Sequence, residues 1–130
     1  MEALMKYGLF LLTALAFSIP VAAGPLTFDE AKVRADSSES ALSSPDIQKL
    51  VNAQGELASR AFQVCVQRTS SNPTDFTVVV QIDIRGSVVH SWREGESRFA
   101  QCFQEIMEKS FSYRPQAEPF FTAFEYTNEH

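Results

Sequence analysis

Hydrophobic and polar positions follow a helical period along the first part of this chain's globular region. Between residues 44 and 65 apolar side chains recur every three or four positions, interrupted only at Gln54. Ser44 is a residue type typical of helix N-caps, and Pro45 suits the first helical turn. The apolar stripe comprises Ile47, Leu50, Val51, Leu57, Ala58, Ala61, Phe62 and Cys65. We expect a helix that buries this stripe and ends before Pro73.

An alternating pattern then predicts a pair of strands. Over residues 76–84 the apolar side chains fall on every second position, which is the period of a half-buried strand. Arg85 and Gly86 supply a tight turn, and residues 87–92 return as a second strand, so a hairpin is expected.

The helical period returns over residues 96–110, and a last strand is expected at residues 120–126. The stripe of this second helix comprises Phe99, Cys102, Phe103, Ile106 and Met107. The resulting order of helix, strand, strand, helix and strand predicts an α+β domain with a three-stranded antiparallel sheet and two helices on one face. The last strand is expected beside the first one, as an exposed edge with unpaired backbone groups.

The pattern of the N-terminal part predicts an export signal followed by a polar segment. Residues 1–23 have a lysine, an apolar run, a proline and small residues before Gly24, as in a secretory signal peptide. The apolar run is too short for a comfortable membrane span, so no membrane insertion is expected after cleavage. Residues 24–44 carry a capping box at Thr27 and Glu30 that predicts a short helix to about Arg34, and then a polar connector. The domain proper is expected at residues 45–127.

Export would determine the oxidation state of the two cysteines. An oxidising compartment favours a structural disulfide between Cys65 and Cys102, both of which lie on the buried faces of their helices. The two thiols have no nearby partner cysteine or histidine of the kind that metal sites use, so no metal and no cofactor is expected.

Composition narrows the class of partner. The net charge is −5 and no basic cluster is present, which argues against binding to nucleic acid or to anionic lipid. Phenylalanine is unusually frequent, with 11 residues, so an aromatic core is expected.

The element order and two cysteines in register resemble the TonB C-terminal-like domains, in particular the AgmX/PglI C-terminal group. The residues that carry the likeness are Cys65, the strand 77–84, Arg85, Gly86, Val88, Cys102, the segment 111–115 and the segment 119–124. The resemblance implies a periplasmic adaptor of a Gram-negative cell envelope that adds an extended partner segment to its sheet. The partner-binding residues would then be Phe120, Phe121, Thr122, Ala123, Phe124 and Tyr126, and the same edge could pair two copies of the chain.

A second hypothesis places binding in a surface loop. Strand alternation prevents Phe120 and Phe121 from facing the same side, so one of them is expected off the main core. That aromatic residue and Trp92 could mark a contact surface, as in a secreted inhibitor or immunity-type protein acting through residues 92–96. His90 and the pair Glu94 and Glu96 are candidate general acids or bases, but their spacing indicates no catalytic set, so no enzyme is expected.

Overall fold

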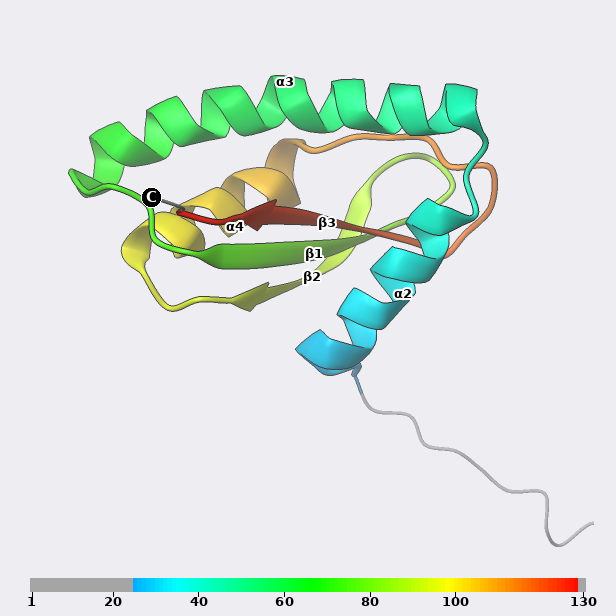
Figure 1. Ribbon diagram of the computed structural model, residues 1–130, viewed down its shortest axis with the longest axis horizontal. Coiled ribbons are helices and arrows are strands. Elements are labelled where there is room, and N and C mark those ends of the chain that lie inside the picture. Colours follow the sequence, from blue (N-terminus) through cyan, green and yellow to red (C-terminus); the bar gives the residue numbers. More distant parts are fainter. Residues whose placement is uncertain (1–24, 129–130) are drawn as a thin grey trace, which may run out of the picture.

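A computed structural model of the chain describes residues 25–128. The expected signal peptide, residues 1–23, lies outside the described residues. The elements are α2 (Phe28–Ser40), α3 (Ser44–Thr69), β1 (Phe76–Ile82), β2 (Val88–Glu94), α4 (Arg98–Ser110) and β3 (Phe120–Tyr126) (Figure 1). The predicted order of the main elements is confirmed.

Helix α2 begins where the capping box predicts. The Thr27 side chain accepts from the Glu30 N–H at 3.1 Å, and the Glu30 carboxylate accepts from the Thr27 N–H at 2.9 Å. The helix continues to Ser40, however, so the prediction of a polar connector over residues 36–44 is wrong for its first half. Side chains of this last turn bond to β3, and that tertiary contact overrides the weak helix propensity of its serines.

Helix α3 is capped one residue earlier than the sequence predicts. Ser43 accepts from the Asp46 N–H at 3.3 Å, and Ser44 is already helical. The helix ends at Thr69, and its C-cap Ser70 adopts the left-handed conformation with φ 53°. Its 26 residues make it the longest of the described elements.

The sheet has the predicted topology. Both β2 and β3 pair antiparallel with β1, giving the order β2-β1-β3. Strand β1 ends at Ile82, two residues earlier than predicted, because Asp83 begins the turn. Its carboxylate accepts from the Arg85 and Ser87 N–H groups at 3.0 Å, and Gly86 takes a positive φ of 96°. Ile84 is therefore half exposed rather than buried in the strand.

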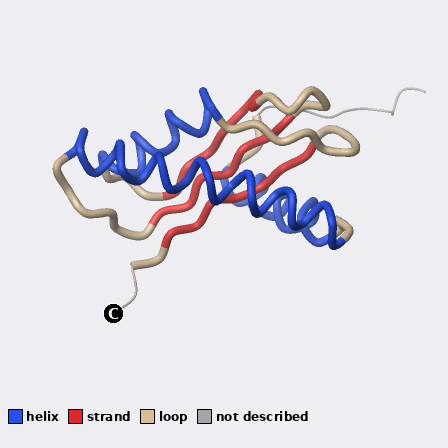
Figure 2. Tube along the Cα trace, turned by 90° about the horizontal axis from the view of Figure 1, so that it is seen from above, coloured by secondary structure: helices blue, strands red, loops and turns tan. Residues whose placement is uncertain are grey.

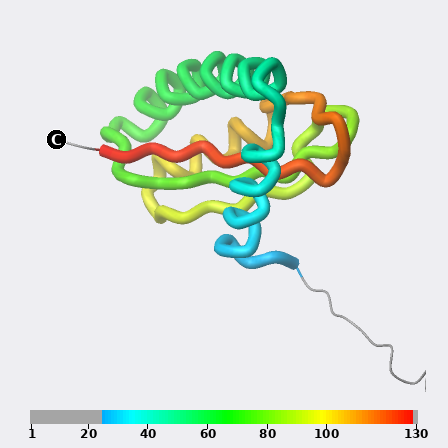
Figure 3. The backbone as a smooth tube through the Cα atoms, turned by 45° about the vertical axis from the view of Figure 1, so that its right-hand side comes forward, coloured from blue at the N-terminus to red at the C-terminus, as the bar shows by residue number. Residues whose placement is uncertain are grey.

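Helices cover both faces of the sheet, which corrects the expectation of two helices on one face only. Helices α3 and α4 cover the face that carries Phe76, Val78 and Val80, and α2 crosses the other face (Figures 1 and 3). Alternation along β1 explains the two cores, because Val79 points away from its neighbours and packs against α2.

The main core is aromatic, and a disulfide fastens its two helices together. Cys65 on α3 and Cys102 on α4 are bonded, with Cα atoms 5.8 Å apart, as the sequence predicts. Both residues are buried, and the bond ties the end of α3 to α4.

Helices α2 and α3 form a hairpin around the edge of the sheet. The connector at residues 41–43 passes outside β3, so α2 and the start of α3 lie on opposite faces of the sheet beside the beginning of that strand (Figures 2 and 3). The end of β3 extends beyond this hairpin toward the C-terminus.

Candidate functional site

The first half of the β3 edge is closed by side chains from α2. The Phe121 N–H points away from β1 and donates to Ser38 Oγ at 3.2 Å. The Ala123 N–H does the same, donating to Glu39 Oε2 at 3.0 Å. The expectation of an exposed β3 edge with unpaired groups is therefore wrong at these two positions, because the last turn of α2 reaches them.

Helix α3 closes the same edge from the other face. Gln54 Nε2 donates to Thr122 Oγ1 at 2.9 Å and to the Ala123 carbonyl at 3.3 Å. The Thr122 hydroxyl, which is fully buried, in turn donates to the Glu39 carboxylate. Gln54, which interrupts the apolar stripe in the sequence, is thus a bridge between α3 and β3.

The second half of the β3 edge lacks such partners. By the alternation of an antiparallel strand, the backbone N–H and C=O of Glu125 point outward like those of Phe121 and Ala123. Among residues 25–128, no hydrogen bond to these two groups of Glu125 is recorded. The edge is therefore free at Glu125.

The Glu125 side chain does not obstruct this free edge. Its carboxylate pairs with Lys32 Nζ on α2 at 2.9 Å, and Lys32 also donates to Asp36 at 2.8 Å. The hydrogen bonds to Asp36 and Glu125 raise the pKa of Lys32 above its ordinary value, so the ammonium stays charged. The ion pair holds Glu125 toward the α2 face of the sheet.

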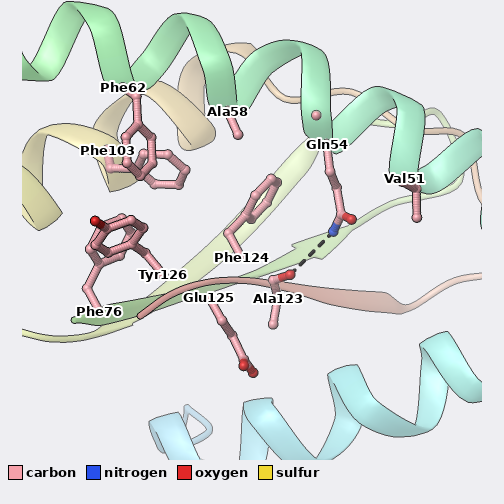
Figure 4. Close-up of a pocket in the computed structure, with 11 residues that line it drawn as sticks. Val51, Gln54, Ala58, Phe62, Phe76, Phe103, Ala123, Phe124, Glu125 and Tyr126 are labelled. Carbon is pink, nitrogen blue, oxygen red and sulfur yellow. Dashed lines mark hydrogen bonds between the residues drawn. The ribbon is translucent and has the colours of Figure 1, made fainter. Parts of the chain in front are cut away.

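An apolar groove runs between α3 and this free half of β3. It has a volume of about 350 Å³ (Figure 4). Gln54 spans the groove at one end, where Figure 4 shows its amide bonded to Ala123. The lining residues are Val51, Gln54, Gly55, Ala58, Phe62, Phe76, Phe103, Ala123, Phe124, Glu125 and Tyr126.

Aromatic rings close the other end of the groove. Phe62 lies 5.2 Å from Tyr126 and 5.6 Å from Phe103, measured between ring centroids, and Phe76 lies 5.8 Å from Tyr126. Tilted, edge-to-face and stacked contacts of this kind favour fixed ring positions. This wall of the groove is thus a packed aromatic cluster.

Gly55 opens the groove in the middle of α3. A Cβ atom built at this position would meet no atom within 4 Å. Glycine in a helix interior costs about 0.5–1 kcal/mol relative to alanine, so its place here needs a reason beyond the helix itself. Its neighbour Val51 is 51 % exposed, although valine is commonly buried. Both features fit a helix face that another molecule covers.

The residues predicted to bind a partner divide into two groups. Ala123, Phe124 and Tyr126 line the groove. Phe120 belongs to the main core, and Thr122 is buried in the hydrogen-bonded bridge. The prediction for these six positions therefore coincides with the groove at three of them.

Phe121 and Trp92 lie together on the opposite face of the sheet. Their ring centroids are 5.9 Å apart, and Trp92 Nε1 donates to the Leu26 carbonyl at 2.8 Å. The expectation that one of Phe120 and Phe121 lies off the main core is confirmed, and the residue is Phe121, but its side chain is buried by α2 rather than free for contact. The indole holds the start of the α2 segment to the sheet, which gives the surface-loop hypothesis little support.

Of the remaining polar candidates, Glu94 and Glu96 line one pocket together with Arg93, and His90 is not part of its lining. Glu94 is exposed at the end of β2, and Glu96 lies just before the Ser97 cap of α4 with its carboxylate 3.6 Å from Arg93. His90 is exposed, and its ring lies tilted beside that of Trp92 with 6.1 Å between the ring centroids. Within residues 25–128 no cluster of three or more metal-binding side chains occurs.

Two further findings concern membrane-spanning helices and the similarity of this chain to known proteins. No helix in the described part is both long and apolar enough to cross a membrane. Comparison with protein-family models, with curated proteins and with solved structures gives no match.

Sequence reasoning missed Gln54, Gly55 and Val51 as site residues. The signal that could have found them is the width of the apolar stripe on α3. Leu50, Leu57, Ala61 and Cys65 are buried, whereas the parallel line of Ile47, Val51, Ala58 and Phe62 is exposed or half buried, and its last three members line the groove. When the apolar stripe of a helix is wider than the face that packs against the core, a second surface is needed to cover the rest of the stripe.

Proposed function

We propose that the protein is an exported interaction module that binds an extended segment of a partner protein along the free half of the β3 edge. The observation that supports this is the groove of about 350 Å³ beside the unpaired backbone groups of Glu125. In strand addition, main-chain hydrogen bonds supply affinity and pockets for alternate side chains supply specificity. This edge offers both elements side by side.

The partner segment would carry at least one large apolar side chain. The groove volume falls at the lower end of the range for ligand pockets, about 300–1,000 Å³. Its lining is formed by apolar and aromatic residues, with only Gln54 and Glu125 as polar members, and Glu125 is paired with Lys32. A residue of the partner that pairs with Glu125 would place its sequence neighbours on the groove face, next to Phe124 and Tyr126.

The cellular setting of this proposal rests on the sequence. The signal-like segment at residues 1–23 and the Cys65–Cys102 disulfide are consistent with an oxidising compartment such as the periplasm. The sequence resemblance to the TonB C-terminal-like domains, if it reflects a relationship, implies the mode of binding proposed here. In this setting the partner would be a protein of the cell envelope.

Filling the groove tests the proposal. We would select a phage-displayed library of random peptides on the oxidised protein and measure the affinity of each enriched peptide for Gly55→Leu. A Cβ atom at this position meets no atom within 4 Å, and the groove of about 350 Å³ lies beside it to take the rest of the leucine side chain. Leucine is also a good helix former, so we expect the fold to be retained while the groove is filled. We expect peptide affinity to fall at least about tenfold, a loss of about 1.4 kcal/mol.

Asn52→Leu is the matched control, because Asn52 is exposed on the same helix outside the groove lining. Its affinity should equal that of the unmodified protein, and amide shifts on binding should centre on Glu125. Equal binding to Gly55→Leu, or amide shifts centred on residues 92–96, would refute the groove as the binding site. A concentration-dependent dimer abolished by Gly55→Leu would instead identify a second copy of the chain as the occupant.

A further inference from the structure

The last turn of α2, residues 36–40, occupies the half of the β3 edge that the proposed partner strand does not reach; we name it the α2 strap. Ser38 and Glu39 accept hydrogen bonds from the Phe121 and Ala123 N–H groups at 3.2 and 3.0 Å. These two N–H groups point away from β1, so they are the ones that a fourth strand would use. The side chains of the strap therefore accept the hydrogen bonds that the backbone of a fourth strand would otherwise accept.

The strap is built from residues that favour a helix weakly. Ser37, Ser38 and Ser40 all have side chains that compete with the helix for backbone hydrogen bonds. The Glu39 carboxylate lies at the negative end of the α2 dipole, and the last turn contains no basic residue to offset it. The strap is thus held chiefly by its bonds to β3 rather than by its own helix.

Helix α2 as a whole is also lightly packed. Its fully buried side chains are those of Ala31 and Ala35, and alanine removes little apolar surface from water. Val33 in the same helix is 64 % exposed. Elements with few buried apolar contacts open at a lower free energy than the core.

We propose that the α2 strap masks a longer strand-binding edge, and that a partner strand which first pairs at Glu125 displaces it to pair with Ala123 and Phe121 as well. This inference rests on the proposed function, since the occupant is the same extended segment. Displacement of the strap frees the Phe121 and Ala123 N–H groups, and pairing at Ala123 also needs Gln54 of α3 to release the Ala123 carbonyl. The pairing would then lengthen from one outward-facing residue to three, and the main-chain affinity would grow with it.

Removing the side-chain bonds of the strap tests the inference in the free protein. In the double variant Ser38→Ala, Glu39→Ala both acceptors are lost, while alanine improves the helix itself. Native-state hydrogen exchange of the Phe121 and Ala123 amides should become at least about tenfold faster, since each amide loses a hydrogen bond of about 1 kcal/mol and the Thr122 hydroxyl loses its bond to Glu39 as well. Ser37→Ala is the control, because the Ser37 hydroxyl makes no bond to β3 among the described residues. It should leave exchange at both amides unchanged.

The binding measurement uses a synthetic copy of the peptide with the highest affinity from the selection described above. The double variant should bind it about five- to tenfold more tightly than either the unmodified protein or Ser37→Ala. The inference would be overturned if the two amides exchanged only through global unfolding. It would also be overturned if the double variant bound the peptide with unchanged affinity. The exchange measurement needs no partner, so failure of the strap is distinguishable from failure of the groove, which Gly55→Leu reports.

Discussion

Replacing Gly55 with alanine should stabilise the protein, and the size of the effect follows from the structure. Gly55 lies inside the 26-residue helix α3, where glycine costs about 0.5–1 kcal/mol relative to alanine. The added Cβ would meet no atom within 4 Å, so no steric penalty opposes this gain. We therefore expect the free energy of unfolding to rise by about 0.5–1 kcal/mol in Gly55→Ala.

Urea unfolding of the oxidised protein, followed by circular dichroism, measures this quantity. A gain of 1 kcal/mol corresponds to about 4–8 °C in Tm for a domain of this size, so thermal unfolding provides a second reading. Ser59→Ala, an exposed position on the same helix, controls for helix propensity alone and should give a smaller gain.

A loss of stability in Gly55→Ala would refute the reasoning. It would mean that α3 lies close against β3 in solution and that the groove is filled in the free protein. An unchanged stability would show that the helix is not formed at this position. The expected outcome, a more stable protein whose groove is narrower, would indicate that the glycine is kept at a cost in stability.

Two other predictions concern the disulfide and the response to alkaline pH. The Cys65–Cys102 bond closes a loop with a sequence separation of 37, which corresponds to about 3–4 kcal/mol by the chain-entropy estimate. The variant Cys65→Ala, Cys102→Ala should lose about this much in urea unfolding, and a loss below about 1 kcal/mol would contradict that role for the bond. Burial, and to a smaller extent the charge of Asp46, raises the pKa of Tyr113 above its ordinary value of about 10. Because the folded-state pKa is the higher one, this stabilising contribution is complete below about pH 10 and is lost as the pH rises through the folded-state pKa. The free energy of unfolding should therefore fall above about pH 10, and the fall should be shallower in Tyr113→Phe; an equally steep fall in that variant would assign the effect to other groups.

Much of the fold could be predicted because its signals are local. The alternation over Phe76–Ile82 and the helical stripe of α4 each reflect one buried face. A single buried face produces a period of apolar residues that can be recognised in the sequence. The cysteine pairing could be predicted as well, because both residues lie on such faces.

The state of the β3 edge could not be predicted, because it depends on residues distant in the sequence. Ser38 and Glu39 lie more than 80 positions before the strand whose N–H groups they accept from. Their local pattern is that of a polar connector, and only contact with β3 makes them the last turn of a helix. The same holds for Gln54, which looks like a gap in an apolar stripe until Thr122 and Ala123 are placed beside it.

The sequence by itself determined the periods of the elements, their order, the disulfide and the central place of β1 in the sheet. Only the tertiary structure decided which part of the β3 edge is closed, which half of the α3 stripe is buried and where an apolar groove is left. The physical reason is that periodicity records how many faces an element buries, but not what covers each of them. A hydrogen bond between Gln54 and Ala123, or the empty space beside Gly55, arises only when separate elements meet.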